Sequence, residues 1–233
     1  MENIKHIFFD LDNTLWDYRK NAVKALERLF AEYNIEEKFG HDFKSFHDHY
    51  YVINEMLWAD FRDGKIGRIE LQQRRFPEAF QDMGIEDTAF ALEFEERFID
   101  EVTKTHYLVE GTEEVLTYLK GKYQLHILSN GFRDITHEKV NGSIIKDYVE
   151  TITTAEDAGV AKPHRDAFQK AIDQTTDATA ENSVYIGDDW IADMVGASRF
   201  GMRAIFFNPL NETHLWIENV PVIDELIELK NYL

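Results

Sequence analysis

The chain has 233 residues, of which 44% are hydrophobic and 30% are charged, as in an ordinary globular protein of one large or two small domains. The absence of cysteine excludes disulfides, thiolate metal ligands and cysteine nucleophiles, and it fits a reducing compartment. The net charge of −19 would repel DNA or RNA, and no apolar stretch has the roughly 18 residues needed to cross a membrane. We therefore expect a cytoplasmic protein that binds neither nucleic acid polymers nor membranes.

Residues 4–9 form an apolar run that predicts a strand, and Asp10 and Asp12 follow it directly. Ligands of an open α/β sheet bind beyond the carboxyl ends of its strands. Two carboxylates this close repel each other unless a metal ion or a proton intervenes. The pair therefore favours a Mg²⁺ site in which one aspartate is a nucleophile. The alternative is an acidic turn, because Asp and Asn are common turn residues.

Residues 17–107 show helical periodicity throughout, with breaks near Gly40, residues 64–67 and Gly84. Four helices without an intervening strand predict a small helical bundle. After residue 108 strands alternate with helices, which predicts a parallel sheet built from right-handed βαβ units. The expected strands are 123–128, 149–153, 183–186 and 203–207, and the expected helices are about 112–121, 133–141, 163–174 and 190–200.

The isolated first strand has to join the later sheet. We therefore predict a doubly wound, Rossmann-like α/β core formed by residues 1–16 and 108–233. Residues 17–107 are predicted to be a helical domain inserted after the first strand of this core. The two crossings, near residues 16–18 and 106–110, are expected to act as a hinge.

Three later segments carry residues that suit an anion or a metal ion. Ser129-Asn130-Gly131 follows the second strand and offers a hydroxyl and backbone amides. Lys162 precedes a predicted helix, Asp188-Asp189 follows the fourth strand, and Asp193 lies in the next helix. Each motif alone has another explanation. Ser129-Asn130-Gly131 is typical of a turn, Lys162 of a solvent-facing lysine, and Asp188-Asp189 of a helix cap. At the carboxyl edge of one parallel sheet, however, they are expected to converge.

In this order, Asp10-x-Asp12-x-Thr14, Ser129, Lys162-Pro163 and Gly187-Asp188-x-x-x-x-Asp193 resemble the four motifs of the haloacid dehalogenase-like hydrolases. The resemblance covers essentially the whole chain, because the inserted helical region corresponds to the mobile cap of that family. It implies that Asp10 is the nucleophile, which takes the phosphoryl group as an aspartyl phosphate. It implies that Asp12 is the acid that protonates the leaving oxygen and then activates water.

The resemblance also implies a Mg²⁺ site on the Asp10 carboxylate, the Asp12 backbone carbonyl and Asp188, with Asp193 orienting Lys162 or a metal-bound water. Oxygen ligands, without cysteine or clustered histidines, favour Mg²⁺ over zinc. The role of Asp189 stays open, because the family often has serine there. The residues expected to hold the phosphate oxygens are Ser129, Lys162, Asn13, Thr14, Asn130 and Gly131.

Asp12 favours a phosphatase over a dehalogenase, because the dehalogenases replace the second aspartate of the first motif. Residues 54–64, with Leu71-Gln72 and Arg75-Phe76, resemble the bacterial pyrimidine 5′-nucleotidases. That resemblance implies a nucleoside 5′-monophosphate as the substrate. A general sugar-phosphate phosphatase, a phosphomutase and a nucleotide-binding module without activity are the alternatives. Either a monomer or a homodimer is compatible with the sequence.

Aromatic and polar residues could provide the contacts to such a leaving group. Trp58, Phe61 and Phe132 offer flat surfaces for stacking on a base. Asn54 and Arg75 could contact the base or the ribose. The alternative for Trp58 and Phe61 is a place in the core of the bundle, because they lie at helical spacing.

Overall fold

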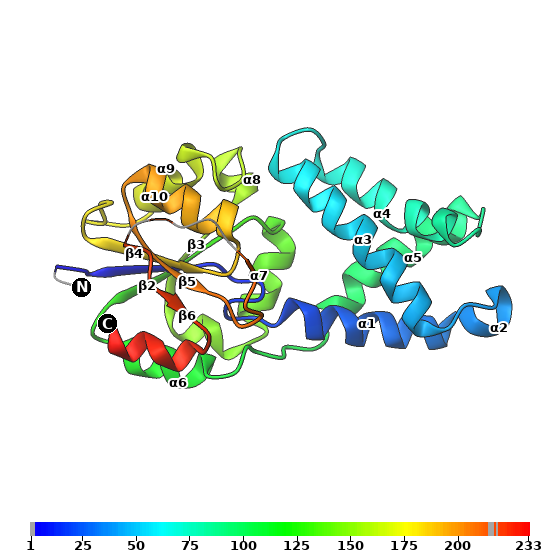
Figure 1. Ribbon diagram of the computed structural model, residues 1–233, viewed down its shortest axis with the longest axis horizontal. Coiled ribbons are helices and arrows are strands. Elements are labelled where there is room, and N and C mark those ends of the chain that lie inside the picture. The colour runs from blue at the N-terminus through cyan, green and yellow to red at the C-terminus, as the bar shows by residue number, and fades with distance from the viewer. Residues whose placement is uncertain (1–2, 214–216, 218) are drawn as a thin grey trace. The chain divides into compact units, whose positions relative to one another are not determined.

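The computed structural model describes residues 3–213, 217 and 219–233, and its contacts divide the chain into two units (Figure 1). One unit comprises Met1–Asp17 and His106–Leu233, and the other comprises Tyr18–Thr105. Among the described residues, no helix combines the length and the apolar character that crossing a membrane requires.

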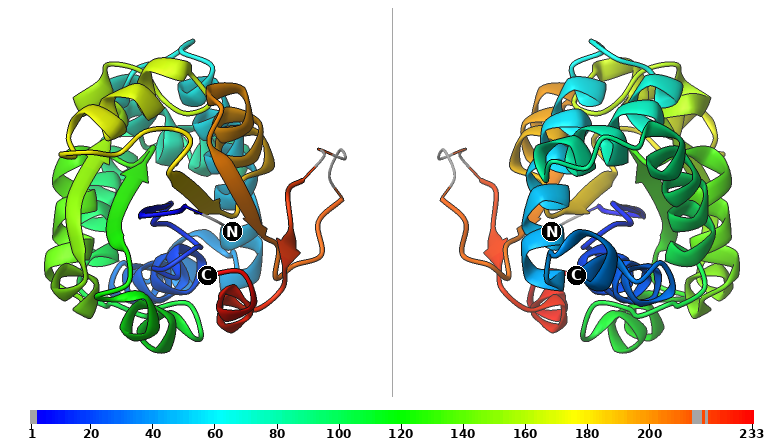
Figure 2. Two further views of the ribbon diagram at one scale, coloured as in Figure 1. Left: turned by 90° about the vertical axis from the view of Figure 1, so that its left-hand side faces the viewer. Right: turned by 90° about the vertical axis from the view of Figure 1, so that its right-hand side faces the viewer.

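The larger unit contains a sheet of six parallel strands in the order β3-β2-β1-β4-β5-β6, with β1 in its middle (Figure 2). This order confirms the doubly wound α/β core and the prediction that the first strand joins it. The strand β6 was not predicted, because two residues are too few to produce a pattern. The strands are β1 (His6–Phe9), β2 (Gln124–Ser129), β3 (Val149–Thr154), β4 (Ser183–Gly187), β5 (Arg203–Phe207) and β6 (Val222–Ile223).

Helices cover both faces of the sheet, which explains why β1 and β4 are buried along their whole length. On one face, α9 and α10 contribute Phe168 and Phe200 to an apolar cluster with Phe8 of β1. Figure 1 shows α6 and the C-terminal 3₁₀ helix η3 on the other face. The helices of this unit are α6 (Thr112–Leu119), α7 (Arg133–Asn141), η1 (Ile144–Asp147), α8 (Ala155–Ala158), α9 (Arg165–Asp173), the π-helix η2 (Trp190–Val195), α10 (Gly196–Phe200) and η3 (Leu226–Asn231).

The smaller unit is entirely helical and is held together by an aromatic core. Phe76 contacts Phe94 with ring centroids 4.7 Å apart, and Phe80 lies 5.3 Å from Phe94. Each fully buried phenylalanine contributes about 1.5–3 kcal/mol relative to exposure. The helices are α1 (Tyr18–Glu32), α2 (Ile35–Phe39), α3 (Phe43–Arg62), α4 (Arg68–Asp82) and α5 (Thr88–Val102).

The short helix α2 adds one helix to the four that the sequence predicts. Asn34 precedes this helix and Gly40 follows it, and both have a left-handed backbone, which limits the helix to five residues. Aspartates cap α3 and α5, since Asp42 accepts a hydrogen bond from Ser45 N (2.8 Å) and Asp87 accepts one from Phe90 N (3.0 Å). That the helical unit acts as a hinged cap stays a prediction.

The register of the sheet decides where the motifs meet. Phe9, the last residue of β1, is aligned with Ile127 of β2 and Ile186 of β4. Asp10 continues this alignment by donating its backbone N–H to the carbonyl of Ile186 (2.8 Å). The residues that follow β1, β2 and β4 therefore share the carboxyl edge at the centre of the sheet, which is where ligands bind in such folds.

Candidate active site

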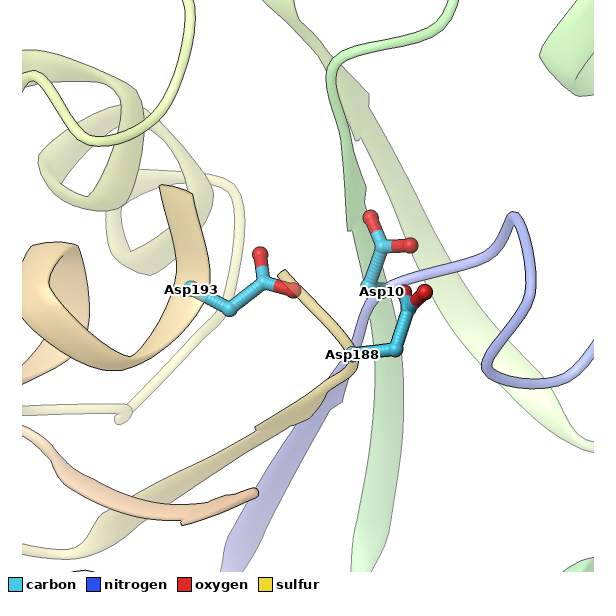
Figure 3. A group of neighbouring side chains, drawn as sticks. All are labelled: Asp10, Asp188 and Asp193. Carbon is cyan, nitrogen blue, oxygen red and sulfur yellow. The ribbon is translucent and has the colours of Figure 1, made fainter. Parts of the chain in front are cut away.

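Three carboxylates gather at this edge of the sheet (Figure 3). Asp10 follows β1, Asp188 follows β4, and Asp193 lies on η2, with one oxygen of each within 4.8 Å of the others. Asp10 and Asp193 are buried, with exposed fractions of 8% and 0%. Buried carboxylates at this spacing require compensation by positive charge.

Lys162 supplies part of that compensation. Its Nζ donates to Asp10 Oδ1 (2.6 Å), Asp193 Oδ1 (2.7 Å) and the hydroxyl of Tyr185 (2.6 Å). Burial lowers the pKa of Lys162, but Asp10 and Asp193 outweigh that effect and raise it above its ordinary value, so the ammonium stays charged. Tyr185 in turn donates to the carbonyl of Leu128 (2.7 Å), which ties this network to β2.

The carboxylates still carry more charge than Lys162 balances. Burial raises the pKa of Asp10 to about 7, against the opposing effect of Lys162 and with a further contribution from Asp193. A divalent cation would stabilise the ionised form, and carboxylate and carbonyl oxygens are the ligands that Mg²⁺ prefers. The donor set at this edge therefore fits Mg²⁺, with Asp10 and Asp188 as the carboxylates best placed to hold it.

Asp193 is better suited to positioning than to direct metal binding. Its Oδ1 accepts from Lys162, and its Oδ2 accepts from the backbone N–H of Asp189 (3.0 Å). Gly187 makes this approach possible, because a Cβ at that position would lie 2.1 Å from Asp193 Oδ2. Asp189, whose role the sequence leaves open, caps η2 by accepting hydrogen bonds from the backbone of Ile191 and Ala192 (2.8 Å each).

The loop after β2 is closed by a hydrogen bond of its own. The hydroxyl of the buried Ser129 accepts from the backbone N–H of Gly131 (3.0 Å). A Cβ at Gly131 would lie 2.7 Å from the hydroxyl of Thr136, so the backbone approaches α7 as only glycine allows. The amide of Asn130 accepts from Lys162 N (2.7 Å) and donates to Lys162 O (3.0 Å). The side chain of Asn130 therefore holds the Lys162 backbone, and a contact of Asn130 with phosphate stays a prediction.

The loop after β1 is a tight turn. Asn13 has a left-handed backbone (φ 61°), and its N–H donates to the carbonyl of Trp16 (2.7 Å). The hydroxyl of the fully buried Thr14 donates to Asp188 Oδ1 (3.2 Å). The Thr14 hydroxyl thus orients the Asp188 carboxylate, and a contact of Thr14 with phosphate stays a prediction.

Asp12 has a partner that the sequence did not reveal. Lys139 Nζ on α7 donates to both of its carboxylate oxygens, at 2.7 and 2.9 Å. Tyr185 was missed as well, although a tyrosine in a fully buried strand signals a hydroxyl that needs a partner. For Lys139 the sequence holds no comparable signal, because a lysine near the end of an amphipathic helix is ordinarily exposed.

Several of the residues expected to contact a leaving group are buried and contact other residues of the protein. In the helical unit, Arg75 donates to Glu95 through Nε (2.9 Å) and Nη2 (2.5 Å) and to Asn54 Oδ1 (3.4 Å), and all three residues are buried. Glu95 thus compensates the buried charge of Arg75, which would be costly unpaired, and a contact of Arg75 or Asn54 with base or ribose stays a prediction. Phe132, at the start of α7, is also buried (5% exposed) and presents no open stacking face. Trp58 is half-buried against Phe61, with ring centroids 5.5 Å apart.

A parallel α/β core whose central strand ends in aspartates, with a lysine and further carboxylates at the same edge, defines a class of hydrolases. The family model for haloacid dehalogenase-like hydrolases matches residues 4–201, and the chain belongs to this family.

Individual relatives match along most of their length. The HAD-hydrolase YfnB of Bacillus subtilis is 29% identical over 210 residues, which cover 90% of this chain and 86% of YfnB. A crystal structure of YfnB bound to magnesium superposes with a TM-score of 0.90 at 25% identity, covering 99% of each chain. The pyrimidine 5′-nucleotidase YjjG of Escherichia coli is 26% identical and covers 87% of this chain and 85% of YjjG. A glyceraldehyde 3-phosphate phosphatase of Pyrococcus abyssi is 28% identical and covers 88% and 81% of the two chains.

Proposed function

We propose that the protein is a Mg²⁺-dependent phosphomonoesterase that acts through an aspartyl phosphate on Asp10. The observation that carries this proposal is the buried Asp10 carboxylate, which Lys162 holds 2.6 Å away beside Asp188. A carboxylate is a poor nucleophile toward a dianion, and the ammonium of Lys162 offsets the repulsion. Asp12 supports phosphate chemistry over dehalogenation, because an alkoxide leaving group needs a proton whereas a halide does not.

The reaction has two steps. An oxygen of Asp10 attacks phosphorus, the bond from phosphorus to the leaving oxygen breaks, and Asp12 gives its proton to that oxygen. Water then attacks the phosphorus of the aspartyl phosphate, Asp12 takes the proton from the water, and the bond to Asp10 breaks. The products are an alcohol and inorganic phosphate. Bound by Asp10, the Asp12 carbonyl and Asp188, Mg²⁺ would neutralise negative charge on the phosphate.

We propose nucleoside 5′-monophosphates, pyrimidine ones first, as the substrates. The resemblance of residues 54–64 to the pyrimidine 5′-nucleotidases supports this choice, as does the similarity to YjjG. The similarity to a glyceraldehyde 3-phosphate phosphatase supports a sugar phosphate as the second candidate. We assign selectivity to the helical unit acting as the cap, with Trp58 as its stacking residue.

The test compares kcat/KM for thymidine and uridine monophosphate with that for glucose 6-phosphate, each with Mg²⁺ and with EDTA. Trp58→Ala should lower kcat/KM for the nucleotides more than for the sugar phosphate, by about 5-fold or more if a stacked base contributes about 1–3 kcal/mol. Tyr51→Ala, an exposed aromatic residue on the same helix, is the matched control (46% exposed). If the wild type has a higher kcat/KM for glucose 6-phosphate than for the nucleotides, the nucleotidase assignment is wrong and only a general phosphatase remains. If the protein binds nucleotides but hydrolyses no phosphate ester, it is a nucleotide-binding module.

A further inference from the structure

The carboxylate of Asp12 is held by a side chain from a different part of the chain. Lys139 Nζ lies 2.7 and 2.9 Å from its two oxygens, so a single ammonium holds both. The Lys139 side chain is 4% exposed, whereas that of Asp12 is 25% exposed. The ion pair therefore joins a buried lysine to a carboxylate that is partly exposed to solvent.

The surroundings of Lys139 fix its position. Its Nζ lies 4.6 Å from the ring centroid of Trp16, which is fully buried and closes the turn after β1. Thr136, one helical turn earlier on α7, is also fully buried and faces the loop at Gly131. Asp12 Oδ2 lies 3.6 Å from the point where a Cβ on Gly131 would stand. Lys139 thus holds the Asp12 carboxylate beside the loop after β2.

We propose that Lys139 is a positioning residue, which fixes the Asp12 carboxylate for the two proton transfers; this inference rests on the proposed function. Asp12 lies in the loop after β1, and the ammonium restricts the rotation of its side chain through two charge-assisted hydrogen bonds. When Asp12 carries the proton that it gives up in the first step, its other oxygen still accepts from Lys139, and this contact lies outside the cluster of Asp10, Asp188 and Asp193. Proton transfer needs this placement, because a displacement of about 1 Å can cost about 100-fold in rate.

The first experiment compares two substrates in Lys139→Met. For an alkyl phosphate, whose leaving oxygen needs a proton, kcat should fall about 30- to 100-fold while KM hardly changes. For p-nitrophenyl phosphate the burst that reports the first step should fall less than about 3-fold, because p-nitrophenolate leaves with little acid assistance. Lys139→Arg should restore most of the alkyl phosphate activity. Lys146→Met, the same change at an exposed lysine of the same unit, should match the wild type.

The second experiment repeats Lys139→Met in the Asp12→Asn background. If Lys139 acts through Asp12, the second change adds less than about 2-fold to the loss on the alkyl phosphate. Independent, multiplying losses, or a large rise in KM that accompanies the loss of kcat, would assign Lys139 to phosphate binding and overturn the inference. Should Lys139→Met fold poorly, Lys139→Gln takes its place, since it keeps one donor toward Asp12. If the wild type is active and the Lys139 variant is equally active, the inference about Lys139 is wrong but the proposed function stands. A wild type without phosphatase activity would refute the proposed function and the inference with it.

Discussion

Asn130 and Lys162 are joined by a pair of hydrogen bonds in which one side-chain amide holds both polar groups of a backbone residue. Asn130 Oδ1 accepts from Lys162 N at 2.7 Å, and Asn130 Nδ2 donates to Lys162 O at 3.0 Å. The loop after β2 and the segment before α9 are thereby fixed to each other. The ammonium that contacts Asp10 and the amides proposed to hold phosphate cannot move independently.

Asn130→Ala removes both bonds and should separate these two parts of the site. We expect kcat/KM to fall by about 10- to 100-fold, because the Lys162 ammonium is no longer held in position at the Asp10 carboxylate. The free energy of unfolding should fall by about 1–2 kcal/mol, as expected for two lost hydrogen bonds to a buried backbone. Steady-state kinetics and urea unfolding measure the two effects. Asn141→Ala, at an exposed position of the same unit, is the control, and equal activity in both variants would contradict this role.

Asp10→Asn should abolish turnover, because an amide cannot form the acyl phosphate. In metal-free buffer near pH 8 the variant should unfold at a higher temperature than the wild type. The reason is that the fold no longer contains a buried carboxylate whose pKa is raised by burial. Mg²⁺ should raise the melting temperature of the wild type and of the control Asp147→Asn, but hardly that of Asp10→Asn. Equal stabilisation of all three by Mg²⁺ would locate the metal elsewhere.

Gly187→Ala should damage the site through Asp193. The added methyl group would stand 2.1 Å from Asp193 Oδ2, inside any permitted contact, so the carboxylate that holds Lys162 must shift. We expect a loss of more than about 10-fold in kcat/KM and a destabilisation of about 1–3 kcal/mol. Gly67→Ala is the matched control, because a Cβ there meets nothing within 4 Å. Retention of full activity by Gly187→Ala would show that the position of Asp193 does not matter.

A buried histidine pair predicts acid sensitivity of the fold. His6 Nδ1 lies 3.1 Å from His126 Nε2, and His126 Nδ1 lies 2.9 Å from the hydroxyl of Thr151. Burial, with a further effect of His6, lowers the pKa of His126 from 6.5 to about 4. The fold therefore favours the neutral ring, whose contribution to stability is complete above pH 6.5 and is lost as the pH falls toward 4.

The corresponding loss is at most about 3 kcal/mol. It is measured as the difference in unfolding free energy between pH 7 and pH 4.5. His126→Asn, which cannot titrate, should show a smaller difference than the wild type. His137→Asn, at a partly exposed position on α7, should keep the wild-type difference. The same pH dependence in all three proteins would assign the acid sensitivity to other groups.

The fold was predictable from the sequence because its signals are local. Most of the longer strands are largely apolar runs, and strand–helix alternation predicts a parallel sheet. The convergence of Asp10, Ser129 and Asp188 at one edge follows from that topology alone. The short helices α2 and α8 and the strand β6 were missed, because two to five residues cannot establish a period.

The contacts that tune the site were not predictable in the same way. Lys139 meets Asp12 only because α7 packs beside the turn after β1, and nothing in the residues around Lys139 encodes that packing. Arg75 is a second example, since nothing in its own segment indicates which side chain it pairs with. Its true partner, Glu95, lies one helix further along the chain, and pairings of this kind depend on how helices are arranged in three dimensions.

The central place of β1 in the sheet has a consequence for synthesis on the ribosome. The first strand emerges before either of its neighbours exists, and β4, one of the two, is not complete until Gly187. The helical unit is synthesised in between, with its own core in a single continuous stretch. In a nascent chain the helical unit can therefore fold before β2 and β4, the strands that pair with β1, have been synthesised. Chains arrested before β4 also lack Asp188 and Asp193, so an incomplete product carries no assembled carboxylate cluster.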